Sequence, residues 1–257
     1  MAQVLYDVIR VDRVGAVALF TIDHPPANAV SGAVVAGLSE ALGDAERDDS
    51  CRAVVITGAG PKFFSAGADI TEFGGGSEGL GGALDLTLRF ERSRLPIVAA
   101  INGIAFGGGC ELTLACDVRV AAKNARFGQP EIKLGIIPGW GGTQRLPRLI
   151  GRARATELLL TGDPIDADRA LEIGLVAEVV DEGGAPDAGK RWAQLFASRA
   201  PLALAATKRS LYEGAHLPIA DALQFEQREF AALFGTEDAA EGISAFMQKR
   251  QAEWKGR

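Results

Sequence analysis

Apolar and polar positions in the first half of the chain follow the short periods of β-strands. Residues 4–22 predict two strands joined by a turn at Asp12–Gly15, with AVALFTID as the second strand. The segments AVVITG (53–58) and IVAAIN (97–102) are continuously apolar, which is typical of strands covered on both faces. VRVAA (118–122) predicts one more short strand. The first half is therefore expected to be an α/β structure of strands and turns.

Apolar residues at helical spacing follow the loop HPPANAV and recur through most of the second half of the chain. Ser31 can cap a helix with one apolar face, made by Val34, Val35, Leu38 and Leu42. Beyond about residue 143 the pattern predicts helices at 152–160, 166–173, 187–199, 201–213, 218–234 and 237–250. The helix at 218–234 carries an apolar stripe of Ile219, Leu223, Phe230 and Phe234. Such a tail can cover its own core or another subunit.

Composition and charge narrow the possible functions. A chain of 257 residues can bury a full core, and its 27 basic and 33 acidic residues give a net charge of −6 without runs of one sign. Nucleic acid is not expected as a partner, because the basic stripe that releases counterions is missing. Three cysteines and two histidines predict neither a disulfide framework nor a metal site.

Neither a signal peptide nor a membrane span is expected. The N-terminal residues MAQVLYDVIRVDR are charged every few positions. The most apolar stretch, 95–118, contains Asn102, Glu111, Asp117 and several glycines, which hydrocarbon tolerates poorly. The sequence thus predicts a cytoplasmic protein with no membrane partner.

Two glycine-rich segments resemble nucleotide-binding loops only superficially. GGGSEG (74–79) matches G-x-G-x-x-G but does not directly follow a predicted strand, and residues 74–82 are expected to form a mobile loop. TGAGPKF (57–63) follows a strand but lacks the third glycine. A nucleotide-dependent oxidoreductase is therefore disfavoured.

Glu111 follows three consecutive glycines at the start of an apolar helix, in GIAFGGGCELTLACD (103–117). A surface acid near a helix N-terminus is favoured by the helix dipole alone. Here the apolar neighbours predict burial, where an unpaired carboxylate is costly. A helix start offers unpaired N–H groups, and glycine lets a ligand approach them closely. The segment therefore predicts an anion-stabilising pocket with an acid or base at its edge.

A second carboxylate and a small-residue turn complete the candidate chemistry. Glu131 lies in ARFGQPEIKLGIIPG (125–139), where Pro130 predicts an extended segment or a turn, and a salt bridge is its alternative role. Burial of both carboxylates would raise their pKa values toward a catalytic range. In KFFSAGADI (62–70), residues 66–68 predict a tight turn, and Asp69 can cap a helix.

These stretches together resemble the enoyl-CoA hydratase/isomerase (crotonase) superfamily almost from end to end. The resemblance is carried by FFSAGADI, by G-G-G-C-E and G-Q-P-E in order, by TGDPIDADRALEIGLVAEVV and by TEDAAEGISAFMQKR. It implies an α/β spiral of repeated ββα units over residues 1–195. Residues 196–257 would then form a C-terminal helical region that assembles a homotrimer, often paired into a hexamer.

The resemblance also implies roles for single residues. Ala68 and Gly108 match the two backbone N–H groups that hold the thioester oxygen of an acyl-CoA as it becomes an enolate. Glu111 matches the group that helps to deprotonate water, and Glu131 the group that protonates the α-carbon. Further expected substrate or CoA contacts are Ala66, Gly67, Asp69, Ile70, Gly139 and Phe246, with Lys62 and Lys249 near the phosphates. Trp140 either narrows the site or packs in the core.

The expected activity is hydration of a 2-trans-enoyl-CoA to a 3-hydroxyacyl-CoA, with no metal and no cofactor beyond the CoA of the substrate. Relatives with other chemistries often change one of the two glutamates, so keeping both favours a hydratase. The alternatives are a Δ3,Δ2-enoyl-CoA isomerase and a non-catalytic CoA-binding protein.

Overall fold

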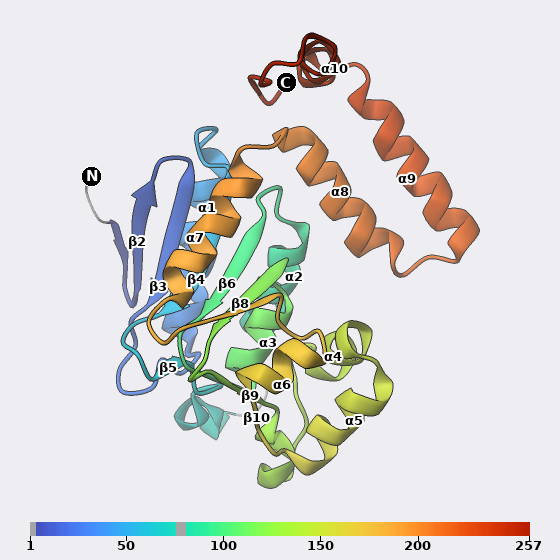
Figure 1. Cartoon of the computed structure of the whole chain (residues 1–257). Helices are drawn as coiled ribbons and strands as arrows, with labels where there is room; N and C mark the ends of the chain where they lie inside the picture. Colours follow the sequence, from blue (N-terminus) through green and yellow to red (C-terminus); the bar gives the residue numbers. More distant parts are fainter. Residues whose placement is uncertain (1–3, 76–80) are drawn as a thin grey trace.

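The computed structural model describes residues 4–75 and 81–257. Its strands are β1 (Val4–Tyr6), β2 (Ile9–Val14), β3 (Val17–Ile22), β4 (Ala53–Gly58), β5 (Phe63–Ser65), β6 (Ile97–Ile101), β7 (Ile104–Phe106), β8 (Val118–Ala122), β9 (Arg126–Gly128), β10 (Ile165–Asp166) and β11 (Glu178–Val180). A seven-stranded sheet has the order β1-β2-β3-β4-β6-β8-β11, and a four-stranded sheet has the order β10-β9-β7-β5 (Figure 1).

Helices connect and cover these sheets. They are α1 (Gly32–Arg47), α2 (Gly81–Arg92), α3 (Gly108–Leu114), α4 (Gly142–Ile150), α5 (Arg152–Thr161), α6 (Ala167–Glu172), α7 (Ala185–Ala197), α8 (Pro201–Gly214), α9 (Ile219–Leu233) and α10 (Glu237–Gln248). Two 3₁₀ segments are η1 (Ile70–Gly75) and η3 (Pro130–Leu134). The helices expected in the second half are all present, with ends that differ by one or two residues. Ser31 caps α1 as predicted, because its hydroxyl accepts a hydrogen bond from the Val34 N–H.

The chain alternates between the two sheets in a repeating order. β4, β6 and β8 are parallel neighbours in the large sheet, whereas β5, β7 and β9 are parallel neighbours in the small one. Each pair of successive strands is followed by helical structure, with η1 and α2 after β5, α3 after β7, and η3 and α4 after β9. This is the α/β spiral of ββα units expected from the sequence.

The N-terminal ladder corrects one boundary. The turn expected at Asp12–Gly15 lies instead at Gly15 and Ala16, since β2 continues to Val14 and Asp12 pairs with Leu19. A separate strand, β1, precedes it and pairs with β2 in antiparallel fashion. The polar residues of β2 are tolerated because this end of the sheet is partly exposed.

The core lies on both faces of the large sheet. Every residue of β4 and β6 is buried, as their continuous apolar sequences predict. α7 covers one face and lies very close to it, because a Cβ at Gly189 would come within 2.8 Å of the Ala100 Cβ. On the other face, α1, α2 and α3 pack with the small sheet into the larger apolar cluster.

The glycine-rich tract 74–82 departs from its prediction as a loop. Gly74 and Gly75 belong to η1, and Gly81 and Gly82 begin α2, whereas 76–80 lie outside the described residues. Glycine costs a helix about 1 kcal/mol per residue. Burial of Ala83, Leu86 and Phe90 on α2 outweighs that cost.

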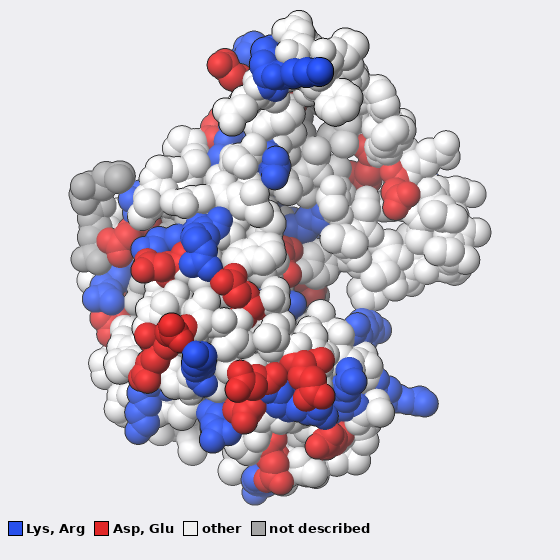
Figure 2. All heavy atoms as spheres, in the orientation of Figure 1, with Lys and Arg blue, Asp and Glu red and all other residues white. Residues whose placement is uncertain are grey.

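α8, α9 and α10 form an arm that projects from the rounded body (Figure 1). Its base is held by a buried network, in which Lys208 Nζ donates to Asp117 Oδ2 at 2.8 Å and to the Leu95 carbonyl at 2.9 Å. The Tyr212 hydroxyl donates to the other Asp117 oxygen at 3.0 Å. Figure 2 shows a mostly uncharged surface where Figure 1 places α9, whereas charged groups of both signs are visible at the α10 end of the arm and over the body. In the described ranges, no helix has the length and apolarity to cross a bilayer.

Candidate active site

Three loops meet where the parallel strands of the small sheet end. β5 leads into residues 66–69, β7 into Gly107 and α3, and β9 into Gln129 and η3. Because parallel strands share the edge at which they end, segments far apart in sequence converge there. The Gly107 N–H donates to the Gly128 carbonyl at 2.9 Å, which ties two of the loops together. The topology thus brings the glycine triplet, the small-residue turn and Glu131 to one place.

Each glycine of the triplet accommodates a different neighbour. A Cβ at Gly107, whose φ is +49°, would lie 2.9 Å from Glu131 Oε1. One at Gly108 would lie 2.0 Å from Cζ3 of Trp140, and one at Gly109 would lie 2.5 Å from the Ser65 carbonyl oxygen. Any side chain here would displace a group of the site or a strand end. Close packing therefore requires the triplet, a reason separate from the ligand access expected from the sequence.

Two backbone N–H groups are available at the convergence of the loops. Gly108 is the first residue of α3, so its N–H has no partner within the helix. In the parts of the chain that the structure describes, neither this N–H nor that of Ala68 donates to another protein atom. A bond from the Val30 N–H to the Gly67 carbonyl (2.8 Å), with one from Asp69 to Val30 (3.0 Å), holds the Ala68 segment in place. Both donors line the same cavity.

Glu111 is buried, with 2 % of its surface exposed, as its apolar neighbours predict. Its Oε1 accepts hydrogen bonds from the N–H groups of Trp140 (2.8 Å) and Gly142 (2.7 Å). Burial raises the pKa of Glu111, while these two donors stabilise the carboxylate and act in the opposite direction. The side chain is therefore fixed in direction and held as an acceptor.

Glu131 lies in η3, directly after Pro130, and is partly exposed. Burial is the main cause that raises its pKa to about 7, and the nearby charge of Glu111 adds to the shift. The turn expected from Pro130 is present as this 3₁₀ segment. Among the ion pairs of the described residues, Glu131 takes part in none, so the salt-bridge alternative is not observed.

Gln129 supports Glu131 and was not singled out by the sequence. It is 1 % exposed, and the amide orientation that satisfies its neighbours places its nitrogen 3.1 and 3.2 Å from the two oxygens of Glu131. The sequence signal for this role is the amide side chain of Gln129, which directly precedes Pro130 and Glu131. Gln129 thus restricts the direction of a carboxyl group that is otherwise open to the cavity.

The main chain of Trp140 is held by hydrogen bonds at both its N–H and its carbonyl. Besides the N–H bond to Glu111, its carbonyl accepts a hydrogen bond from Arg145 Nη1 at 2.6 Å. Arg145 is itself fixed by a bond of 2.6 Å from its Nε to Glu91. Trp140 is 6 % exposed, and its ring covers Gly108. The ring both packs in the core and narrows the cavity, so the two roles expected for it coexist.

A cavity of about 150 Å³, here called the site cavity, joins these groups. It brings together most of the residues expected to contact substrate, namely Ala66, Gly67, Ala68, Ile70, Gly108, Glu111, Glu131 and Gly139. The remainder of its wall includes Pro130, Leu134, Ile136, Ile137 and Trp140. A small, mostly apolar space with two unpaired N–H groups and two carboxylates suits a substrate that develops negative charge on oxygen while protons move.

Four expected contacts do not line the site cavity. Asp69 points elsewhere, because its Oδ1 accepts hydrogen bonds from the N–H (3.0 Å) and hydroxyl (2.6 Å) of Thr71, which is the capping role. Lys62 is exposed, with its ammonium 5.0 Å from the centre of the Phe63 ring. Phe246 and Lys249 are exposed at the end of α10 on the arm. Within residues 4–75 and 81–257, no three His, Cys, Asp or Glu side chains are placed to hold a metal.

The chain is similar in sequence to known proteins over nearly its whole length. Residues 12–257 match the family described as Enoyl-CoA hydratase/isomerase. The chain is 42 % identical over 252 residues to the short-chain-enoyl-CoA hydratase of Clostridium acetobutylicum, covering 95 % of this chain and 96 % of that protein. It is also 42 % identical to the 2,3-dehydroadipyl-CoA hydratase of Escherichia coli, covering 96 % and 98 %.

Solved structures show the same similarity in three dimensions. The crystal structure of an enoyl-CoA hydratase from Bacillus anthracis matches with a TM-score of 0.93 and 39 % identity, covering 98 % of this chain and all of that one. The likeness extends over both sheets and the helical arm, since nearly the whole chain is superimposed.

Proposed function

The chain belongs to the enoyl-CoA hydratase/isomerase family and is an enzyme with hydratase activity, and we propose that it adds water across the double bond of a 2-trans-enoyl-CoA. The product is a 3-hydroxyacyl-CoA. One observation carries this proposal: Glu111 and Glu131 line the same cavity in unequal environments. Two carboxyl groups in different environments can act as base and acid on one substrate.

The environments assign the two roles. Burial raises the pKa of Glu111, but the two backbone N–H bonds that it accepts stabilise its ionised form, which suits a base. Among the described residues Glu131 accepts no such pair of backbone N–H bonds, and burial raises its pKa to about 7, so a large fraction carries a proton near neutral pH. We therefore assign Glu111 as the group that takes a proton from water and Glu131 as the group that gives one.

The proposed reaction moves one proton from water to Glu111 and one proton from Glu131 to the substrate. Water oxygen bonds to the β-carbon as Glu111 accepts one of its protons, and the electrons of the double bond pass to the α-carbon and the thioester oxygen. The N–H groups of Ala68 and Gly108 would hold that oxygen, because no protein atom in the described residues uses them. Glu131 then transfers its proton to the α-carbon. A proton passing from Glu111 to Glu131 restores the starting state.

The activities named for two relatives support acyl-CoA substrates of modest size. Those relatives include a short-chain-enoyl-CoA hydratase and a crotonyl-CoA hydratase, each about 40 % identical to this chain. The site cavity of about 150 Å³ is small beside the range of roughly 300–1,000 Å³ usual for ligand pockets. We take a short 2-enoyl thioester as the substrate, with CoA itself outside the cavity and no other cofactor.

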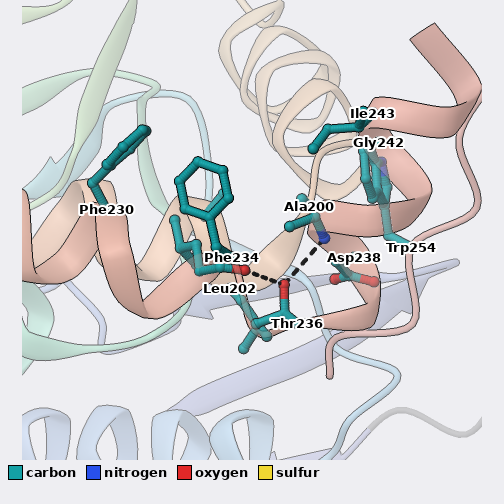
Figure 3. A pocket seen from close by; sticks show the side chains of 12 residues that line it. Ala200, Leu202, Phe230, Phe234, Thr236, Asp238, Gly242, Ile243 and Trp254 are labelled. Atoms are coloured by element: carbon teal, nitrogen blue, oxygen red, sulfur yellow. Dashed lines mark hydrogen bonds between the residues drawn. The ribbon is translucent and has the colours of Figure 1, made fainter. Parts of the chain in front are cut away.

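We further propose that residues 196–257 join copies of this chain into a trimer or hexamer. Apolar side chains on the arm are widely exposed, with Ile219 at 75 %, Phe234 at 62 % and Phe246 at 86 %. Beside them is an apolar hollow of about 300 Å³, where Phe230 and Phe234 pack edge to face with ring centres 4.9 Å apart and Trp254 lies against Gly242 (Figure 3). Exposed apolar surface of this extent is typical of interaction sites.

The same arrangement gives the arm a second proposed task. Phe246 and Lys249 do not line the site cavity of their own chain, so in an oligomer they are free to contact the CoA bound by a neighbouring subunit. We assign them this contact, with Lys62 as a phosphate contact from the body. A cation near CoA phosphates strengthens binding by charge.

Turnover of crotonyl-CoA tests the proposed reaction directly. We expect loss of the enoyl thioester absorbance and formation of 3-hydroxybutyryl-CoA, and activity that persists after dialysis against a strong chelator. Migration of the double bond in a 3-enoyl-CoA, with slow hydration, would indicate an isomerase instead. CoA binding without turnover of either substrate would indicate a non-catalytic protein.

A further inference from the structure

A second cavity lies next to the site cavity, on the other side of Trp140. This adjacent cavity has a volume of about 210 Å³ and is lined by the start of α1, the start of α2 and the residues after Ala68. Trp140 lines both cavities, and among the described residues no other does. Trp140 therefore contributes to the walls of both cavities.

The position of Trp140 is fixed rather than adjustable. Its peptide N–H is bonded to Glu111 and its carbonyl to Arg145, so the main chain is held on both sides. The ring lies so close to Gly108 that a Cβ at this glycine would clash with it. A close-packed side chain with a fixed backbone does not move aside without loss of contacts. Trp140 is therefore a wall rather than a gate.

The adjacent cavity is suited to an apolar chain. Its inner wall is made by Val30 and Ala83, which are buried, and by Val35. Its acidic residues are Asp69 and Glu72, which are engaged with Thr71 and with the Gly32 N–H (2.9 Å). A neutral alkyl chain is compatible with this lining, whereas a chain that ends in a carboxylate would meet negative charge.

We propose that Trp140 sets the length limit of the acyl group, and that the adjacent cavity is a closed extension of the acyl pocket. This inference rests on the proposed function, because it concerns the acyl part of the same substrate. With Trp140 present, the acyl chain ends at the ring, so four-carbon chains are favoured over ten-carbon chains. With a smaller residue at position 140, neutral longer chains enter the adjacent cavity.

The test compares kcat/KM for crotonyl-CoA and trans-2-decenoyl-CoA in the unmodified enzyme, in Trp140→Ala and in Trp140→Phe. The decenoyl-to-crotonyl ratio should rise by about tenfold or more in Trp140→Ala, the size of effect that a change of even one methylene in an apolar pocket produces. Trp140→Phe keeps a ring and should change the ratio much less. Trp140→Leu serves the same purpose if the alanine variant does not fold.

A second substitution locates the gained space. In the Trp140→Ala background, Val35→Phe refills the adjacent cavity and should remove the gain for decenoyl-CoA. A ten-carbon substrate with a terminal carboxylate should gain less than decenoyl-CoA in the single variant, because of Asp69 and Glu72. A gain that survives Val35→Phe would overturn the assignment of the adjacent cavity.

The outcomes separate this inference from the proposed function. An unmodified enzyme that hydrates crotonyl-CoA and decenoyl-CoA with similar kcat/KM would overturn the length limit and leave the hydratase reaction intact. An unchanged ratio in both Trp140→Ala and Trp140→Leu would do the same. An unmodified enzyme that hydrates neither substrate would instead contradict the proposed function itself.

Discussion

The Trp140 ring lies directly on the backbone of Gly108, so close that a Cβ at residue 108 would come within 2.0 Å of ring atom Cζ3. This contact links the wall of the cavity to one of the two N–H groups proposed to hold the thioester oxygen. A substitution at either residue should therefore alter the packing of the other.

Gly108→Ala should destabilise the fold by about 1–3 kcal/mol, the usual cost of overpacking a close-packed interior. Adding Trp140→Ala should recover part of that loss, because the clash is then removed, and a coupling free energy of about 0.5–3 kcal/mol is expected. Chemical denaturation of the two single variants and the double variant measures it. Gly139→Ala is the matched control, since a Cβ there meets no atom within 4 Å. Strictly additive effects would contradict the contact.

The two glutamates should each be needed for turnover. Glu111→Gln and Glu131→Gln keep size and polarity but cannot exchange a proton near neutral pH. Each should lower kcat by about 10²–10⁴, and the double variant should lose much less than the product of the two, since the groups act together in one addition of water. Thermal unfolding measured in parallel separates a catalytic loss from a structural one. A fully active Glu131→Gln enzyme would exclude the two-carboxylate mechanism.

Glu131 should also make activity and stability depend on pH. Its pKa is raised from 4.5 to about 7, so kcat for hydration should fall as the pH rises through about 7 and the proton donor is lost. The folded state binds more protons here than the unfolded state. The free energy of unfolding contributed by Glu131 is therefore full below pH 4.5 and is lost as the pH rises through 7. Denaturation of wild type and Glu131→Gln across this range should show a flatter profile for the variant.

The exposed stripe of the arm should control assembly. Leu223→Glu places a charge where 56 % of an apolar side chain is exposed on α9, and burial of that charge at an interface is costly. Sedimentation should show a shift toward smaller species. Leu5→Glu, at 65 % exposure on β1, is the control and should sediment as wild type. Equal behaviour of the two variants would argue against an interface at the stripe.

The sequence predicted those features of the candidate site that depend on local pattern. Apolar neighbours alone predicted the burial of Glu111, and Pro130 predicted the turn that carries Glu131. The roles of Ala68 and Gly108 came from a family resemblance, and these two residues do line one cavity with the glutamates. Their convergence follows from parallel strands that end at one edge, which the sequence pattern does not display by itself.

The remaining features depend on packing that no local pattern encodes. α2 forms from Gly81 because buried contacts override the helix cost of glycine. The glycine triplet was interpreted as ligand access, whereas the structure adds three separate steric requirements. The direction of the Gln129 side chain depends on tertiary packing. So does the position of Trp140, which lines two cavities. Asp69 was expected to contact substrate, but its capping bonds to Thr71 direct it away from the site cavity.

The buried network at the base of the arm has a consequence for association. Lys208 and Tyr212 on α8 donate to the two oxygens of Asp117, and the Ile97 N–H also donates to Oδ2, at 2.7 Å. These bonds attach α8, the first helix of the arm, to the residues that begin β6 and precede β8 within a single chain. Binding that requires no reorientation avoids the entropy cost of ordering a mobile element. We therefore expect a partner of the arm to meet α8 already fixed to the body, so that this helix need not be ordered on association.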